Sequence, residues 1–69
     1  MTYWKKTKDG FRALEKKGKD CIEERRERVD ADCVRHVLLY GGKSRVYHSY
    51  SGFDRGPGLQ RVMRELVAV

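Results

Sequence analysis

The chain has 69 residues, of which 39% are hydrophobic and 38% are charged, and its net charge is +6. This length has room for one small domain, so we expect a single unit over residues 1–69, with residues 1–8 as a flexible arm. No apolar run approaches the roughly 20 residues of a membrane-spanning helix, and no apolar segment follows the N-terminal lysines as in a secretory signal. We therefore expect a cytoplasmic protein without a membrane partner.

The positive charge is unevenly distributed along the chain. Residues 1–19 carry seven basic and two acidic side chains, residues 20–32 carry three basic and six acidic, and residues 33–69 carry six basic and two acidic. Clustered cations neutralise phosphates, and aromatic rings set among them can stack on bases. The pattern favours nucleic-acid binding, and a solvated surface that keeps the protein soluble is the alternative interpretation.

Residues 10–29 carry apolar side chains at helical spacing. The residues that fall on one side of a helical projection are Phe11, Leu14, Cys21, Ile22 and Val29. Asp20 and Glu23 also resemble a capping box, whereas Gly18 would cost a continuous helix about 1 kcal/mol. We therefore predict either one helix over residues 10–29, kinked at Gly18, or two helices that meet there.

Residues 33–50 predict a β-hairpin. β-Branched and aromatic residues fill both halves, and Gly41-Gly42 between them accepts the positive φ angles of a tight turn. A strict two-residue turn places Val37 opposite Val46, whereas a three-residue loop with a glycine bulge places Leu38 opposite Val46. We favour the bulged register because it separates polar from apolar residues better.

The end of the chain predicts a loop followed by a helix. Residues 51–58 contain three glycines and Pro57, and the apolar residues after them recur at helical spacing, at Leu59, Val62, Met63 and Leu66. The predicted fold class is therefore α+β. It consists of an antiparallel hairpin of two or at most three strands packed against an N-terminal helix, broken or intact at Gly18, and a C-terminal helix.

Four side chains are of types that bind zinc: Cys21, Cys33, His36 and His48. Only Cys33 and His36 are close in the sequence, and strand alternation would point them to opposite faces of the hairpin. A secreted mini-domain that depends on disulfides usually has four or more cysteines. We therefore expect two reduced thiols and no metal or other cofactor.

The histidines also allow an RNA-cleaving site. His36 or His48 would act as a general acid or base, while Arg35, Arg45 and Tyr47 would stabilise charge on a phosphate. The stretch from Gly56 to Glu65 resembles the last helix of HicA-type toxins, which are small RNA-cleaving proteins with a double-stranded-RNA-binding-like fold. Lys43-Ser44-Arg45 stands where that family has Gly-Ser-His, so the resemblance transfers no residue role.

We predict a protein that binds RNA or DNA rather than an enzyme. The cations expected to contact phosphate are Lys5, Lys6, Lys8, Arg12, Lys16, Lys17, Lys19, Arg35, Arg45 and Arg55. The aromatic residues expected to anchor the interface are Tyr3, Trp4, Tyr50 and Phe53, although Trp4 and Phe53 would equally serve to close a small core.

Two other functions remain as alternatives. The paired basic and acidic patches and the small core also suit a regulator or inhibitor of phage or mobile-element type, which would bind a host protein and form a homodimer. The last alternative is a metal-free toxin that cleaves RNA with a strand histidine.

Overall fold

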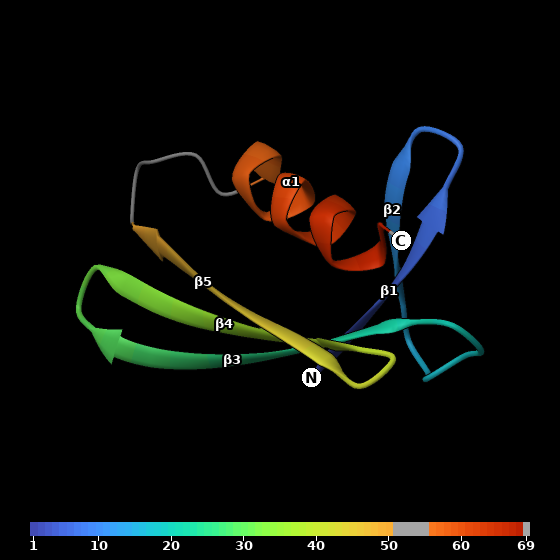
Figure 1. Ribbon diagram of the computed structural model, residues 1–69. Helices are drawn as coiled ribbons and strands as arrows, with labels where there is room; N and C mark the ends of the chain where they lie inside the picture. Colours follow the sequence, from blue (N-terminus) through green and yellow to red (C-terminus); the bar gives the residue numbers. More distant parts are fainter. Residues whose placement is uncertain (51–55, 69) are drawn as a thin grey trace.

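The computed structural model describes residues 1–50 and 56–68 (Figure 1). Its elements are the strands β1 Thr2–Thr7, β2 Gly10–Leu14, β3 Ile22–Asp30, β4 Cys33–Tyr40 and β5 Lys43–Tyr50, and the helix α1 Gly56–Val67. The strands form one antiparallel sheet in the order β2-β1-β3-β4-β5. Figure 1 shows α1 lying along one side of this sheet.

The predicted N-terminal helix is wrong, and so is the two-helix fold built on it. Residues 10–29 form β2, a loop and most of β3, and residues 2–7, expected as part of a flexible arm, form β1. Asp20 in the loop has a φ of 59°, a left-handed conformation that no continuous helix contains. In β3 the buried residues are Ile22 and Glu24, which are two apart as strand alternation requires.

The predicted hairpin is present as β4 and β5, but its predicted register is wrong. Tyr40 pairs with Lys43 and Val37 pairs with Val46, which is the register of the two-residue turn. Gly41 and Gly42 both have positive φ, at 55° and 81°, so the turn is closed without a bulge. The register places His36 and His48 on opposite faces of the sheet, because His36 pairs with Tyr47, the neighbour of His48 on β5.

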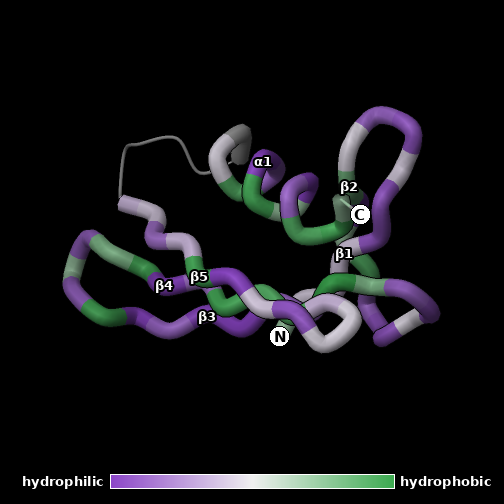
Figure 2. Tube along the Cα trace, in the orientation of Figure 1, coloured by the Kyte–Doolittle hydropathy of each residue, from purple (hydrophilic) through white to green (hydrophobic). Residues whose placement is uncertain are grey.

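The core lies between α1 and one face of the sheet. Its buried residues are Ile22, Leu38, Leu59, Met63 and Leu66. The three from α1 recur at the predicted helical spacing, and Figure 2 shows apolar segments alternating with charged ones along this helix. Among the described residues, no helix is long and apolar enough to cross a membrane.

Gly58 allows α1 to lie close to β5. A Cβ atom at this position would collide with the hydroxyl and ring of Tyr47, because they occupy the space where it would stand. The glycine that the sequence predicted as part of a loop is therefore inside the first turn of α1, where it lets helix and strand approach.

Strand alternation gives the sheet a covered face and an open face. The covered face packs against α1 and includes Trp4, Ile22, Glu24, Arg26, His36, Leu38, Tyr40, Arg45, Tyr47 and Ser49. The open face includes Tyr3, Lys5, Arg12, Leu14, Glu23, Arg25, Glu27, Arg35, Val37, Leu39, Val46, His48 and Tyr50. Leu39 and Val46 are 40% and 55% exposed, so no described element packs over this part of the open face.

Candidate functional site

The cations predicted to contact phosphate lie in four parts of the structure. Lys5, Arg12 and Arg35 project from the open face, whereas Lys6 and Arg45 project from the opposite face and remain exposed. The others are Lys8 in the turn between β1 and β2, and Lys16, Lys17 and Lys19 in the loop between β2 and β3. Arg55 and Phe53 lie outside the described residues.

Lys5 and Arg12 form the densest positive charge of the open face. They are direct cross-strand partners on β1 and β2, and both are exposed. Like charges at opposed positions of a sheet are destabilising, so the pair does not help the fold. Among residues 1–50 and 56–68, neither cation forms an ion pair, and both charges are available to a ligand.

Two further arginines lie on the open face, separated from Lys5 and Arg12 by the row of paired residues that contains Tyr3 and Glu23. Arg25 is exposed on β3, opposite Val37, and it was not predicted as a site residue because it lies in the acidic stretch of residues 20–32. Arg35 on β4 lies between Glu27 and His48, with its Nε 3.5 Å from Nε2 of His48. Among the described residues, the open face therefore carries four cations and three acids, because Asp30 pairs with Cys33, the partner of Tyr50, and joins Glu23 and Glu27 on this face.

The predicted aromatic anchors lie on both faces. Tyr3 is half-buried on the open face, and Tyr50 is exposed near its far end. A hydrogen bond with the Cys33 thiol raises the pKa of Tyr50. Trp4 is on the covered face, where its Nε1 donates a hydrogen bond to Glu24 Oε1 at 2.6 Å and its ring packs against the core. Trp4 therefore closes the core, as one of its two sequence interpretations expected.

The covered face contains a buried chain of three polar side chains. Glu24, His36 and Ser49 lie on β3, β4 and β5, and they are 0%, 8% and 5% exposed. Ser49 Oγ lies 2.7 Å from His36 Nε2, and His36 Nδ1 lies 2.5 Å from Glu24 Oε2. We call these residues the Glu24–His36–Ser49 chain.

The partners of Glu24 determine the protonation of this chain. Burial acts to raise the pKa of Glu24, but hydrogen bonds from Arg26, His36 and Trp4 outweigh it and lower the pKa. An ionised carboxylate only accepts hydrogen bonds, so Nδ1 of His36 carries the proton that points at Glu24. In the neutral imidazole, Nε2 is then an acceptor, and the Ser49 hydroxyl donates to it.

The structure contains no metal site among its described residues. No group of three histidine, cysteine, aspartate or glutamate side chains there is arranged to hold an ion. Both cysteines have free thiols, with Cys33 buried and Cys21 half-buried. Cys21 Sγ accepts a hydrogen bond from the backbone N–H of Gly18 at 3.1 Å, which holds the loop between β2 and β3 in place.

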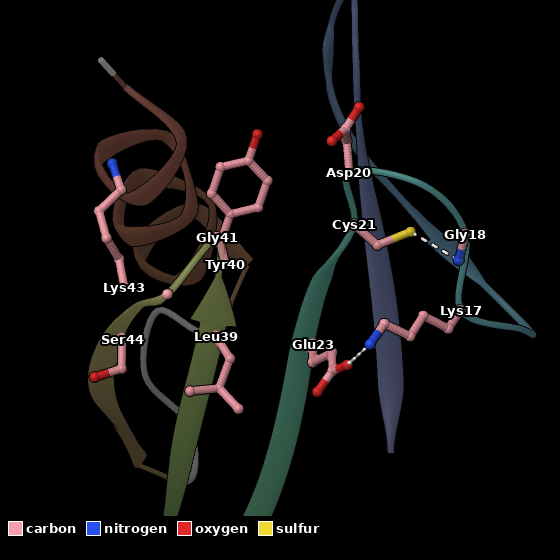
Figure 3. Close-up of a pocket in the computed structure, with 11 residues that line it drawn as sticks. Lys17, Gly18, Asp20, Cys21, Glu23, Leu39, Tyr40, Gly41, Lys43 and Ser44 are labelled. Carbon is pink, nitrogen blue, oxygen red and sulfur yellow. Dashed lines mark hydrogen bonds and ion pairs between the residues drawn. The ribbon is translucent and has the colours of Figure 1, made fainter.

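A cleft of about 650 Å³ opens at one end of the sheet, between the loop before β3 and the turn between β4 and β5 (Figure 3). Figure 3 shows Lys17 turned toward Glu23, and the Nζ–Oε1 distance is 2.7 Å. The hydrogen bond and charge of Glu23 raise the pKa of Lys17. Lys43 donates instead to the carbonyl of Ala68 at 3.3 Å. Both lysines that line the cleft therefore have partners within the protein, so the cleft does not offer unpaired cations to a ligand.

Comparison with protein-family models, curated proteins and solved structures gives no match for this chain. Two arrangements are distinguished by their chemistry: the cations of the open face, which lack ion pairs among the described residues, and the Glu24–His36–Ser49 chain of the covered face.

Proposed function

We propose that the protein binds single-stranded nucleic acid on the open face of its sheet. The observation that carries this proposal is the pair Lys5 and Arg12, which are opposed, exposed and without an ion pair in the described structure. Two phosphates of a nucleic-acid backbone would neutralise this pair and relieve its repulsion. Arg25 and Arg35 supply further contacts along the same face.

The shape of the open face favours a single strand over a duplex. Where Thr2, Tyr3 and Trp4 of β1 pair with β3, five strands with spacings of about 4.8 Å lie side by side over roughly 19 Å, which exceeds the groove of about 12 Å that a duplex offers to protein elements. Unpaired bases can instead lie on the surface and stack on aromatic rings. Tyr3 and Tyr50 provide such rings on the open face.

The proposal can be tested by fluorescence anisotropy with a labelled oligothymidylate and the matching oligouridylate. We expect binding at low salt that weakens steeply as salt is raised, because bound cations release counterions. The variant K5Q/R12Q should bind more weakly at every salt concentration. The slope of the logarithm of the binding constant against the logarithm of the salt concentration should become shallower by about 0.7 for each phosphate that the variant no longer neutralises.

A matched control is available on α1. Arg61 and Arg64 are both exposed on the helix, and R61Q/R64Q removes the same net charge from the other side of the sheet. We expect this control to keep the affinity and salt slope of the wild type. Equal weakening by both double variants would refute a site on the open face, and no binding at low salt would refute nucleic-acid binding altogether.

A second candidate function is recognition of a protein partner. It is favoured by the exposure of Leu39 and Val46, which form an apolar area with Val37 along β4 and β5 on the open face. Apolar contacts depend little on salt, so a complex formed this way should survive concentrations that release an oligonucleotide. Light scattering and a pull-down with wild type and V46K would test it. A monomer that captures no protein, or capture unchanged in V46K, would contradict this function.

A further inference from the structure

The Glu24–His36–Ser49 chain has the order and connectivity of a nucleophilic triad. In the neutral imidazole with its proton on Nδ1, the Ser49 hydroxyl donates to Nε2, and Nδ1 donates to a carboxylate that is itself held by further donors. Such an arrangement allows the imidazole to remove the hydroxyl proton as the oxygen attacks, while the carboxylate fixes the tautomer. The open-face cations have no part in this chemistry.

We propose that Ser49 is a nucleophile that accepts the acyl group of a small carboxylic ester, with His36 as its general base and Glu24 as the residue that positions His36. The inference is independent of the proposed nucleic-acid binding, because the chain lies on the other face of the sheet. A small acyl donor is required because Ser49 is 5% exposed.

The positioning of His36 is stronger than one hydrogen bond provides. Glu24 Oε2 also accepts from Arg26 Nε at 2.8 Å, and Glu24 Oε1 accepts from Trp4 Nε1 at 2.6 Å. The carboxylate is therefore fixed from two sides while it orients the imidazole. The ring of Tyr47 lies against His36 with a centroid separation of 5.6 Å, which restricts the imidazole further.

Ser49 is the second-last residue of β5. β5 is the last strand of the sheet, so beyond it no other described strand closes the edge. Among the described residues, the only buried side chains that are not hydrophobic are the three members of this chain. Every buried polar side-chain atom among the described residues has a hydrogen-bond partner, so the hydrogen bonds of the Glu24–His36–Ser49 chain are complete without a ligand.

The acyl transfer can be written with its bonds and protons balanced. Ser49 Oγ attacks the carbonyl carbon of the ester as its proton passes to His36 Nε2, giving a tetrahedral adduct. The adduct collapses by breaking the bond to the leaving oxygen, which takes the proton from His36 when the leaving group is an ordinary alcohol. The product is an ester between the acyl group and Ser49, and His36 returns to its neutral tautomer.

The experiment uses p-nitrophenyl acetate, an activated ester whose phenolate leaves without needing a proton, so His36 then releases the proton of Ser49 to the solvent. Acetylation of the folded wild type is followed by intact mass and assigned by peptide mapping. Ser44 is a comparison within the molecule, because it is an exposed serine on the same strand. We expect Ser49 to be acetylated at least tenfold faster than Ser44, despite being buried.

Variants separate general-base catalysis from simple exposure. Ser49→Ala should remove the adduct from its peptide, and His36→Gln should slow acetylation of Ser49 about a hundredfold. His48→Gln is the matched control, since His48 is exposed on the open face, and it should leave the rate at Ser49 unchanged. Glu24→Gln should slow the reaction less than His36→Gln does, because the imidazole is kept but its tautomer is no longer fixed.

The wild type alone keeps the test decisive if His36→Gln fails to fold by circular dichroism, because Ser49 and Ser44 are compared within one folded molecule. Acetylation of Ser49 no faster than that of Ser44, or a rate unchanged in folded His36→Gln, would each overturn the inference.

Discussion

The two faces of the sheet differ in how their polar groups are satisfied. On the covered face, Glu24, His36 and Ser49 are buried, and each forms a hydrogen bond with another of these three residues. On the open face, Lys5, Arg12 and Arg25 are exposed and form no ion pair with any described residue. The comparison indicates that the covered face determines the fold, while the open face has charge that the fold does not use.

The largest contrast is expected between two adjacent leucines on β4. Leu38 is fully buried under α1, whereas Leu39 is 40% exposed on the other face. Leu38→Ala should lower the free energy of unfolding by about 2 to 5 kcal/mol, because it leaves a cavity in the core. Leu39→Ala should lower it by less than about 1 kcal/mol. Urea unfolding of both variants measures the difference, and equal losses would refute the assignment of faces.

The next largest effect is expected at Glu24. Glu24→Gln removes the charge that Arg26 and His36 contact on the covered face. Breaking a buried pair costs about 3 to 5 kcal/mol, but the Arg26 side chain is 54% exposed and can be rehydrated. We therefore expect a loss of about 2 kcal/mol in urea unfolding. Glu27→Gln, an exposed carboxylate on the open face of the same strand, is the control and should change stability little.

The pH dependence of stability should also trace to Glu24. Its pKa is lowered in the folded protein, so its stabilisation is complete above the carboxyl pKa of the unfolded chain. The stabilisation is lost as the pH falls through the lowered pKa of the folded state. The melting temperature should therefore fall more between neutral and acid pH for the wild type than for Glu24→Gln. Parallel plots of melting temperature against pH for the two proteins would show that Glu24 has an ordinary pKa.

The smallest effect is expected on the open face, and its sign is opposite. The variant K5Q/R12Q relieves the repulsion of an opposed like-charge pair, so it should raise stability by about 0.2 to 0.5 kcal/mol. Comparison of urea midpoints at low and high salt would measure this, because salt screens the repulsion in the wild type. A clear loss of stability would instead give these cations a role in the fold.

The parts of the fold that the sequence predicts are those with a single consistent local signal. Gly41-Gly42 between two runs of β-forming residues predicts the hairpin, and Leu59, Met63 and Leu66 predict the buried stripe of α1. The strands β2 and β3 were not predicted, because the buried position of β3 where alternation requires an apolar residue is occupied by Glu24. The apolar residues of β2, the following loop and β3 instead match the spacing of a helix.

The Glu24–His36–Ser49 chain could not be predicted because it depends on the pairing registers of β3 with β4 and of β4 with β5. The bulged hairpin register that sorts polarity better places His36 and Ser49 on opposite faces, whereas the observed register places them on the same face. Glu24 joins them only because β3 lies beside β4. Lys5, Arg12 and Arg35 of the open face were predicted as site residues. Which predicted cations share a face could not be predicted, because residues 10–29 were expected to form a helix and not strands.

Methyl NMR during titration with an oligothymidylate tests most directly whether the open face is the binding surface. Val37, Leu39 and Val46 report on the open face, and Leu38 and Leu66 report on the core beneath the covered face. We expect the first three to shift with increasing oligonucleotide while the core methyls stay in place. Shifts confined to methyls of the core and α1, or no shift at a concentration that saturates anisotropy, would contradict binding at the open face.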